Sequence, residues 1–241
     1  MSIMHRTRLV ARWLGIEVTR YNPSQSAAAC LGVQLARNNI DCVVDVGAHD
    51  GGFGRLVRAA GFNRDLVSFE PQVSAHNRLV AISRKDATWY IAPRMALGDV
   101  DTTTEINIAG NGVSSSLLPM MPTHQSAAPA SRYVGRESVL VKRLDSVDLV
   151  PLAKARRMFL KIDTQGYELP VLVGASAIMD RIAGVQVELS VVPLYQGQVL
   201  YQELIQWLSQ AGFDLWGVAP GFLDVASGRM LQFDAVFFRA P

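Results

Sequence analysis

The chain has few cysteines, no long apolar run and little net charge. Only Cys30 and Cys42 occur among 241 residues, and their spacing suits neither a disulfide framework nor a metal site. We therefore expect buried thiols in a reduced, intracellular protein. No apolar run approaches the roughly 18 residues that a membrane-crossing helix needs. A net charge of +2 argues against an extensive nucleic-acid-binding surface.

The N-terminal segment lacks the continuous apolar core and the small-residue cleavage site of a secretion signal. Residues 1–22 interleave arginines with apolar side chains such as Trp13 and Leu14. This pattern predicts an amphipathic segment that docks on the core, and contact with a membrane surface or a partner is the alternative. We expect a soluble, cytoplasmic enzyme in which residues 1–40 form a helical appendage and residues 41–241 a single α/β domain.

Apolar periodicity predicts strands and helices that alternate along the chain. The predicted strands are 43–46, 66–69, 88–91, 103–108, 138–144, 158–162, 184–189, 213–218 and 234–238. The predicted helices are 27–38, 53–60, 73–84, a helix that ends at 172, and 200–210. Such alternation is typical of a parallel sheet with helices on both faces.

A long segment over 109–136 separates two of the predicted strands and is rich in Gly, Ser, Pro and Met. Loops of this length in a compact domain usually have a function or are disordered. The polar and sulfur-containing side chains that would suit a mobile lid over a substrate are Ser114, Ser115, Ser116, Met120, Met121 and His124. An insertion without a role in binding is the alternative.

The stretch 43–52 is the centre of the predicted site. A run of β-branched residues ends at Gly47 and is followed by a second glycine, Gly51, which predicts a strand, a tight turn and a helix start. A glycine turn lets a ligand approach the backbone, and the helix N-terminus favours polar or negative ligand atoms. Glu70 ends the next strand, where a carboxylate can accept hydrogen bonds from the ribose of NAD or of S-adenosylmethionine.

The composition of the first turn favours one of these two cofactors. A dinucleotide-binding turn has the pattern G-x-G-x-x-G, which brings the backbone against a pyrophosphate. Here Asp45 and Asp50 flank the turn. A carboxylate repels a pyrophosphate and attracts a sulfonium or an ammonium group. We therefore predict S-adenosylmethionine, with an NAD-linked oxidoreductase as the alternative.

Several segments in this order resemble the FkbM family of S-adenosylmethionine-dependent methyltransferases. They are 44–48 with Gly51, 69–71, 96–99, 115–117, 143–146, 160–168 (LKIDTQGYE), 188–190 with 194–195, and 232–235. The resemblance implies a Rossmann-like, seven-stranded methyltransferase sheet over residues 41–241, mostly parallel with an antiparallel last strand. It also implies an O-methyltransferase that acts on a hydroxyl of a sugar, a glycan or a secondary metabolite.

The resemblance further implies which residues contact the cofactor. Two glycines shape the turn, a carboxylate takes the ribose, and residues near 96–98 flank the adenine. The expected cofactor-binding residues are Asp45, Gly47, Ala48, His49, Gly51, Glu70, Pro71, Leu97 and Gly98. The sequence departs from the family at His49 and Asp50, where members commonly have an asparagine and a small or apolar residue.

Methyl transfer to a hydroxyl needs alignment of the two reactants and a general base. Asp163, just after the predicted strand 158–162, is the first candidate for the base. Glu188 and His124 are the second and third. The alternatives are a helix cap or cofactor contact for Asp163, an ion pair with Lys161 for Glu188, and an ordinary loop position for His124. Two carboxylates without a third ligand make a poor metal site, so we expect no metal.

The expected partner is a small-molecule or glycan acceptor, and no nucleic acid. No Asn-Pro-Pro-Tyr-like turn follows strand 158–162, which disfavours methylation of amino groups. The aromatic residues that could stack on sugar rings, or instead serve the core or a dimer contact, are Tyr195, Tyr201, Trp207 and Trp216. A homodimer, and a non-catalytic scaffold that only binds the cofactor, stay open.

Overall fold

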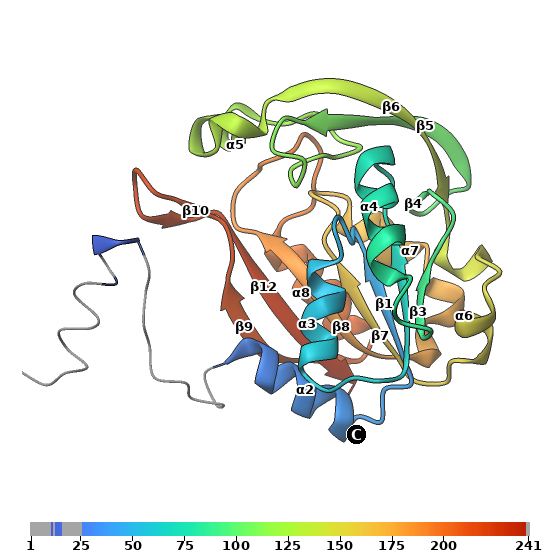
Figure 1. Cartoon of the computed structure of the whole chain (residues 1–241). Coiled ribbons are helices and arrows are strands. Elements are labelled where there is room, and N and C mark those ends of the chain that lie inside the picture. The colour runs from blue at the N-terminus through green and yellow to red at the C-terminus, as the bar shows by residue number, and fades with distance from the viewer. Residues whose placement is uncertain (1–10, 12, 16–25, 240–241) are drawn as a thin grey trace, which may run out of the picture.

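The computed structural model describes residues 11, 13–15 and 26–239 (Figure 1). Its centre is a seven-stranded sheet in the order β3-β2-β1-β7-β8-β12-β9. The strands are β1 (Cys42–Val46), β2 (Asp65–Phe69), β3 (Trp89–Ile91), β7 (Met158–Ile162), β8 (Ile182–Ser190), β9 (Phe213–Pro220) and β12 (Gln232–Arg239). Strand β12 runs antiparallel to β8 and β9, and the other neighbouring pairs are parallel. The predicted α/β fold with one antiparallel strand is confirmed.

Helices cover both faces of this sheet because each strand buries side chains on both sides. In β1, Val43 packs in a cluster with Leu79 of α4 (Val73–Ser83), on the face that α2 (Ala27–Arg37) and α3 (Gly52–Ala59) also cover. The next residue, Val44, packs in the opposite cluster with Leu172 and Leu204. That face carries α6 (Val150–Lys154), α7 (Glu168–Val173) and α8 (Tyr201–Gln210). Figure 1 shows α3 and α4 in front of the sheet.

Helix α2 packs directly against the sheet. Leu31 and Leu35 are buried in the same cluster as Val43 and Phe159, and the Ser26 hydroxyl caps the helix by accepting from the Ala29 amide. The amphipathic segment predicted over 1–22 lies almost entirely outside the described residues. The division of the chain at residue 40 therefore stays a prediction. Among the described residues, no helix has the length and apolar character that crossing a membrane requires.

A second sheet lies across one end of the first (Figure 1). It has three strands in the order β4-β6-β5, namely β4 (Ala96–Leu97), β5 (Thr102–Ala109) and β6 (Tyr133–Lys142). The two strands β5 and β6 were predicted, but β6 begins and ends earlier than expected, and Leu144–Ser146 is a short 3-10 helix. The two-residue strand β4 and the small hairpin of β10 (Leu223–Asp224) and β11 (Arg229–Met230) were not predicted.

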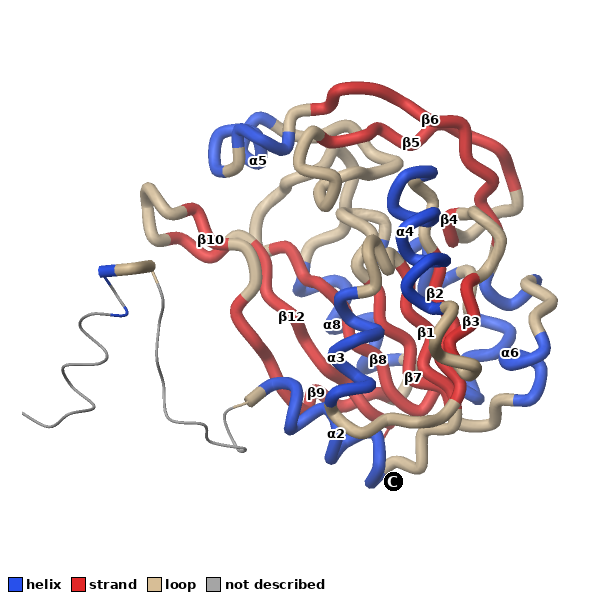
Figure 2. The backbone as a smooth tube through the Cα atoms, in the orientation of Figure 1, coloured by secondary structure: helices blue, strands red, loops and turns tan. Residues whose placement is uncertain are grey.

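The segment 109–136 has more regular structure than the sequence predicted. It contains helix α5 (Pro122–Ala127), a 3-10 turn (Pro129–Ser131) and the start of β6. The Met121 amide donates to the Leu194 carbonyl at 2.8 Å, and an antiparallel bridge joins Met120 to Tyr195. In Figure 2, α5 and the neighbouring loops lie at the end of the β5–β6 hairpin. The sequence had predicted no helix here, and the role of this segment as a mobile lid stays a prediction.

Close contact between α7 and the turn after β4 makes Gly174 a test of the fold. A Cβ on Gly174 would lie 1.9 Å from the Gly98 carbonyl oxygen, although its φ of −69° suits any residue. We expect Gly174→Ala to lower the free energy of unfolding by about 1–3 kcal/mol through overpacking, as measured by urea denaturation. In the control Gly217→Ala, the new Cβ meets nothing within 4 Å, and we expect a change within about 0.5 kcal/mol. Equal effects of the two substitutions would contradict the contact.

Candidate active site

The turn after β1 takes a shape that needs glycine at its first position. Gly47 has a φ of +77°, and a Cβ there would lie 1.9 Å from the Asp163 carbonyl oxygen. The Asp163 amide donates to the Val46 carbonyl at 3.1 Å. His49, in the same turn, has a φ of +48°, a left-handed conformation that is uncommon for residues with side chains. The carboxyl ends of β1 and β7 therefore meet at this turn, with bare backbone between them.

Glu70, just after β2, is held by the same turn. Its Oε2 accepts from the His49 amide at 2.7 Å, and its Oε1 accepts from the Gln72 amide at 2.8 Å. The residue is 2% exposed, and burial raises the pKa of its carboxyl to about 7 although both amides oppose that shift. The two amides fix the direction of the carboxylate and leave further acceptor capacity on each oxygen.

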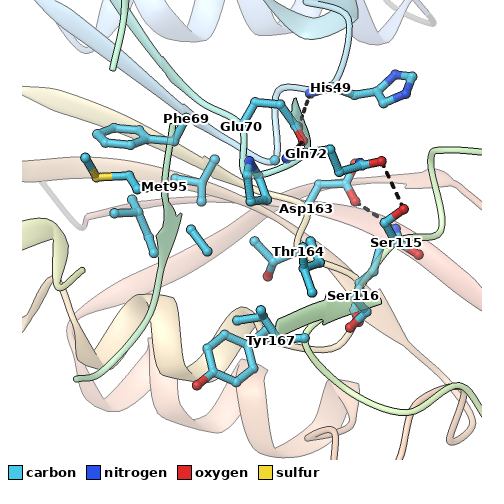
Figure 3. A pocket seen from close by; sticks show the side chains of 18 of the residues that line it. His49, Phe69, Glu70, Gln72, Met95, Ser115, Ser116, Asp163, Thr164 and Tyr167 are labelled. Carbon is cyan, nitrogen blue, oxygen red and sulfur yellow. Dashed lines mark hydrogen bonds between the residues drawn. The ribbon is translucent and has the colours of Figure 1, made fainter. Parts of the chain in front are cut away.

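A cavity opens beside this turn at the carboxyl ends of β1, β2 and β7, and residues of the second sheet roof it. Figure 3 shows Phe69 and Met95 on one side of the cavity and Ser115 and Ser116 on the other, with Glu70 between them. The predicted cofactor residues that line it are Gly47, His49, Glu70, Pro71 and Leu97. One part of its wall is apolar and the other carries hydroxyl, amide and carboxylate groups.

The other predicted cofactor residues are not among those that line this cavity, and their contact with the cofactor stays a prediction. Asp45 is fully buried beneath the turn, because its position in β1 directs it to the face that α3 covers. Ala48 packs in the core beside α3 and α4. A Cβ on Gly51 would lie 3.0 Å from Trp89, and one on Gly98 would lie 2.9 Å from Tyr167. These residues shape the site by close packing.

Lys161, in β7, joins the turn to the buried carboxylate of Asp45 and to the partly exposed carboxylate of Asp163. Its Nζ lies 3.3 Å from Asp45 Oδ1 and 3.5 Å from Asp163 Oδ2, and it donates to the Gly47 carbonyl at 3.3 Å. Burial disfavours the ammonium, but the charges of Asp163 and Asp45 outweigh this effect and raise the pKa of Lys161. Burial likewise raises the pKa of Asp45, opposed by Lys161.

A second cavity adjoins the first, and the three predicted catalytic residues all line it. Asp163, Glu188 and His124 face this space, although they lie far apart in the sequence. The residues that line both cavities are Val113, Asp163 and Gln165. The structure therefore brings the three candidates together, and it places Asp163 at the boundary between the two spaces.

The environments of Glu188 and His124 differ in charge. Glu188 Oε2 accepts from Gln165 Nε2 at 2.8 Å and from Gln232 Nε2 at 2.7 Å, and burial, followed by the charge of Asp163, raises the pKa of Glu188 well above its usual value. The ring of His124 lies 5.2 Å from the ring of Tyr195. Burial lowers the pKa of His124 to about 4, so the imidazole is neutral at neutral pH.

Metal ligands are not assembled in the part of the chain that the structure describes. No group of three or more His, Cys, Asp or Glu side chains there could hold a metal ion. Asp163 and Glu188 instead share an amide donor from Gln165, whose Nε2 lies 2.8 Å from both carboxylates.

Comparison with known families identifies the chain. The methyltransferase FkbM domain family matches residues 45–215, a range that contains the turn, Glu70, Asp163 and Glu188. The chain belongs to the FkbM methyltransferase family. Its cofactor is S-adenosylmethionine. No curated protein sequence matches the chain.

Solved structures with a similar fold share little sequence with this FkbM methyltransferase. An S-adenosylmethionine-dependent methyltransferase from Mesorhizobium loti has 9% identity and a TM-score of 0.47, over 90% of this chain and 100% of that one. An rRNA methylase from Streptococcus thermophilus has 10% identity and a TM-score of 0.47, over 93% and 100%. Magnesium protoporphyrin IX methyltransferase from Synechocystis, with bound SAM, has 9% identity and a TM-score of 0.44, over 98% and 91%. We draw no conclusion about the acceptor from matches at this level.

The roof of the site in this FkbM methyltransferase is tied to the turns beneath it. Ser115 Oγ donates to Gln72 Oε1 at 3.1 Å, and Ser116 Oγ donates to the Gln165 carbonyl at 2.7 Å. Tyr195 is fully buried, and its hydroxyl lies 3.2 Å from the Ser114 carbonyl. The three serines singled out in the sequence therefore belong to the site, and hydrogen bonds fix their positions.

Several polar residues of the site were not predicted as functional. Gln72 and Tyr167 line the first cavity, Gln232 lines the second, and Gln165 lines both. Gln165 had a signal in the sequence, because it stands within the LKIDTQGYE segment on which the family resemblance rests. Gln232 begins β12 and reaches Glu188 only through the pairing of β12 with β8, which sequence spacing does not reveal.

The buried ion pair beneath the turn gives a test of this arrangement. Lys161→Met leaves Asp45 buried without its counter-ion, and we expect a loss of about 3–5 kcal/mol in the free energy of unfolding. Without Lys161, the pKa of Asp45 in the folded state rises further above its value in the unfolded chain. Asp45 then ionises readily only in the unfolded chain, so the loss of stability should be larger at pH 8 than at pH 5. Urea denaturation at both pH values measures it.

The matched control is Lys142→Met, which breaks an ion pair of 2.6 Å with Asp101 at the surface and should cost less than about 1 kcal/mol. Adding Asp45→Asn to Lys161→Met should restore part of the lost stability. A Lys161→Met variant as stable as the Lys142→Met variant would show that Lys161 does not hold the turn.

Proposed function

We propose that this methyltransferase transfers a methyl group to a hydroxyl of a sugar, a glycan or a secondary metabolite. The observation that carries the proposal is the second cavity, where Asp163 and Glu188 face the same space beside the cavity that we assign to the cofactor. Transfer to an alcohol requires removal of its proton, for which a carboxylate within hydrogen-bond reach is suited.

The residues of the first cavity fit S-adenosylmethionine. The absence of a side chain on Gly47 lets the turn pass directly against the main chain of Asp163. Gly47 also lines the cavity, so a ligand there can lie against bare backbone. Glu70 presents a fixed carboxylate that can accept from ribose hydroxyls. The apolar side chains available to flank the adenine are Phe69, Met95, Ala96, Leu97, Ile106 and Leu117. When bound, the cofactor supplies an electrophilic methyl group on a sulfonium.

Asp163 and Glu188 are assigned together as the general base. Asp163 lines both cavities, so it lies where an acceptor hydroxyl would meet the reacting group. Glu188 lines the acceptor cavity, and its raised pKa makes its carboxylate a stronger proton acceptor than an ordinary glutamate. Because the two share one amide donor, their proton affinities belong to the pair. Lys161 beside Asp163 limits the accumulation of negative charge.

His124 is assigned to recognition of the acceptor. Its pKa of about 4 makes it a weak base at neutral pH, whereas a neutral imidazole can both donate and accept hydrogen bonds. The other polar residues that line the cavity are Asn111, Ser114, Gln165 and Gln232. Of the described residues that line it, none is Lys or Arg. This lining suits an uncharged, hydroxyl-rich molecule, and it disfavours the phosphates of a nucleic acid, which call for cationic partners.

Cofactor binding tests the role of Glu70. We expect Glu70→Ala to weaken binding of S-adenosylhomocysteine by about 10- to 150-fold, which corresponds to about 1.5–3 kcal/mol for a hydrogen bond to a charged group. Ribose hydroxyls favour the ionised carboxylate, whose pKa is about 7 in the free protein. Affinity of the unchanged protein should therefore rise from about pH 6 to pH 8, with proton release, and the variant should lose this dependence. Calorimetric titration measures both effects.

The control for this titration is Glu105→Ala on β5, because Glu105 is exposed and lies outside the cavity wall. It should leave affinity and its pH dependence unchanged. A folded Glu70→Ala variant that binds S-adenosylhomocysteine as tightly as the unchanged protein would refute the ribose assignment.

Transfer of a labelled methyl group tests the acceptor class. The protein is incubated with S-adenosylmethionine labelled in its methyl group and with panels of glycosides, amines and RNA, and each labelled product is tested for its ether or amine linkage. We expect label on an oxygen of a hydroxylated acceptor. Asp163→Asn and Glu188→Gln should each lower turnover by about 100-fold or more and keep most of the affinity for S-adenosylhomocysteine.

The control for these substitutions is Glu203→Gln on α8, whose side chain is exposed. Preferential label on nitrogen, or full turnover in both carboxylate variants, would refute O-methyl transfer by this pair. Cofactor binding without transfer to any panel would favour the non-catalytic scaffold.

A further inference from the structure

Gln165 occupies the boundary between the two cavities in a strained conformation. It lines both spaces, and its φ is +56°, followed by Gly166 at +100°. A residue with a side chain seldom adopts a positive φ. Such strain persists where surrounding contacts over-determine the conformation, and it concentrates at functional sites. The contacts of Gln165 therefore indicate what its position serves.

The side-chain nitrogen, the side-chain oxygen and the main-chain oxygen of Gln165 all have hydrogen-bond partners. The amide nitrogen Nε2 donates to Asp163 Oδ1 and to Glu188 Oε2, both at 2.8 Å. The amide oxygen Oε1 accepts from the Tyr195 hydroxyl at 2.8 Å, and the main-chain oxygen accepts from Ser116 Oγ at 2.7 Å. The orientation of the amide is thereby fixed, because its oxygen would repel the two carboxylates if it were reversed.

The surroundings of Glu188 make these neutral donors important. The carboxylates that face it come from three elements: Asp163 after β7, Glu168 at the start of α7, and Asp234 on β12. The ammonium of Lys161 opposes them, and Gln165 and Gln232 add hydrogen bonds to its Oε2. Hydrogen bonds to a carboxylate favour its charged form, whereas neighbouring negative charges and burial disfavour it.

We propose that Gln165 is the positioning residue of the acid–base pair, a single amide that holds Asp163 and Glu188 side by side as carboxylates at the boundary of the two cavities. The inference rests on the proposed function only in taking this pair to act on the acceptor hydroxyl. Without the amide, two adjacent negative charges lose their shared donor, and one carboxylate takes up a proton. A protonated carboxyl cannot accept the proton of an alcohol.

Gln232 provides a matched comparison within the same site. Its side-chain amide, on β12, donates to the same oxygen of Glu188 at 2.7 Å. Among the described residues, this amide donates to Glu188 and not to Asp163. Removing either amide should disfavour the charged form of Glu188. The effect of losing the Gln165 amide should depend on the charge of Asp163, because that amide bridges Asp163 and Glu188. The effect of losing the Gln232 amide should not.

The experiment follows the titration of Glu188 directly, so that no acceptor is needed. Glutamate is labelled with ¹³C at its side-chain carboxyl, and the resonance of Glu188 is assigned by its loss in Glu188→Gln. We expect Gln165→Met and Gln232→Met each to raise the titration midpoint of Glu188 by about one pH unit. In an Asp163→Asn background, the effect of Gln165→Met should fall by about half or more, while that of Gln232→Met persists.

An unchanged midpoint in Gln165→Met, or the same dependence on Asp163 for both glutamines, would overturn the inference. If Gln165→Met does not fold by circular dichroism, Tyr195→Phe takes its place. That variant frees the amide oxygen of Gln165, and we expect a smaller rise of about half a pH unit; no rise would overturn the inference. Because the titration is independent of methyl transfer, its failure is distinguishable from failure of the labelling experiment.

Discussion

The buried ammonium of Lys161 is the constraint on which the site depends. A charge in the interior is costly unless it is paired and hydrogen-bonded, and the groups that pair with it come from separate segments: Asp45 in β1, the Gly47 carbonyl in the turn, and Asp163 after β7. Their convergence on one charge fixes the relative positions of the turn and of the two strand ends. Gly47 and Asp163 line the first cavity, and Asp163 also lines the second.

The position of the site follows from the parallel arrangement of the strands. The carboxyl ends of β1, β2 and β7 lie at one edge of the sheet, so the residues just beyond them, Gly47, Glu70 and Asp163, share one space. Strand β8 adds Glu188 nearer to β12, which sets the second cavity to the side of the first. The order of the strands thereby separates the two cavities and leaves Asp163 between them.

Much of this arrangement was predictable from the sequence, because the fold depends on local patterns. Alternating apolar runs predicted the sheet, the glycine turn and Glu70 indicated a site at the ends of the first two strands, and the position of Asp163 just after strand 158–162 made it a candidate. Burial of Asp45 was not predicted, since a carboxylate beside a glycine turn is expected at a ligand, and only the pairing with Lys161 from another strand allows it to be buried. The bond from Gln232 to Glu188 likewise depends on strand pairing between distant segments. Short elements such as β4 and α5 (Pro122–Ala127) gain their order from tertiary contacts, which leave little periodicity to detect.

The insertion between β5 and β6 and the turn after β1 differ in how freely their sequences can change. The serines 114–116 and helix α5 come from an insertion between β5 and β6. Within it, Ser115 and Ser116 bond to Gln72 and Gln165, which follow strands β2 and β7. The ion pairs of Lys161 involve no residue of this insertion. Substitutions at its other positions can therefore reshape the second cavity while the turn after β1 keeps its geometry. One catalytic framework could thus acquire new acceptors in evolution through divergence of a single connection.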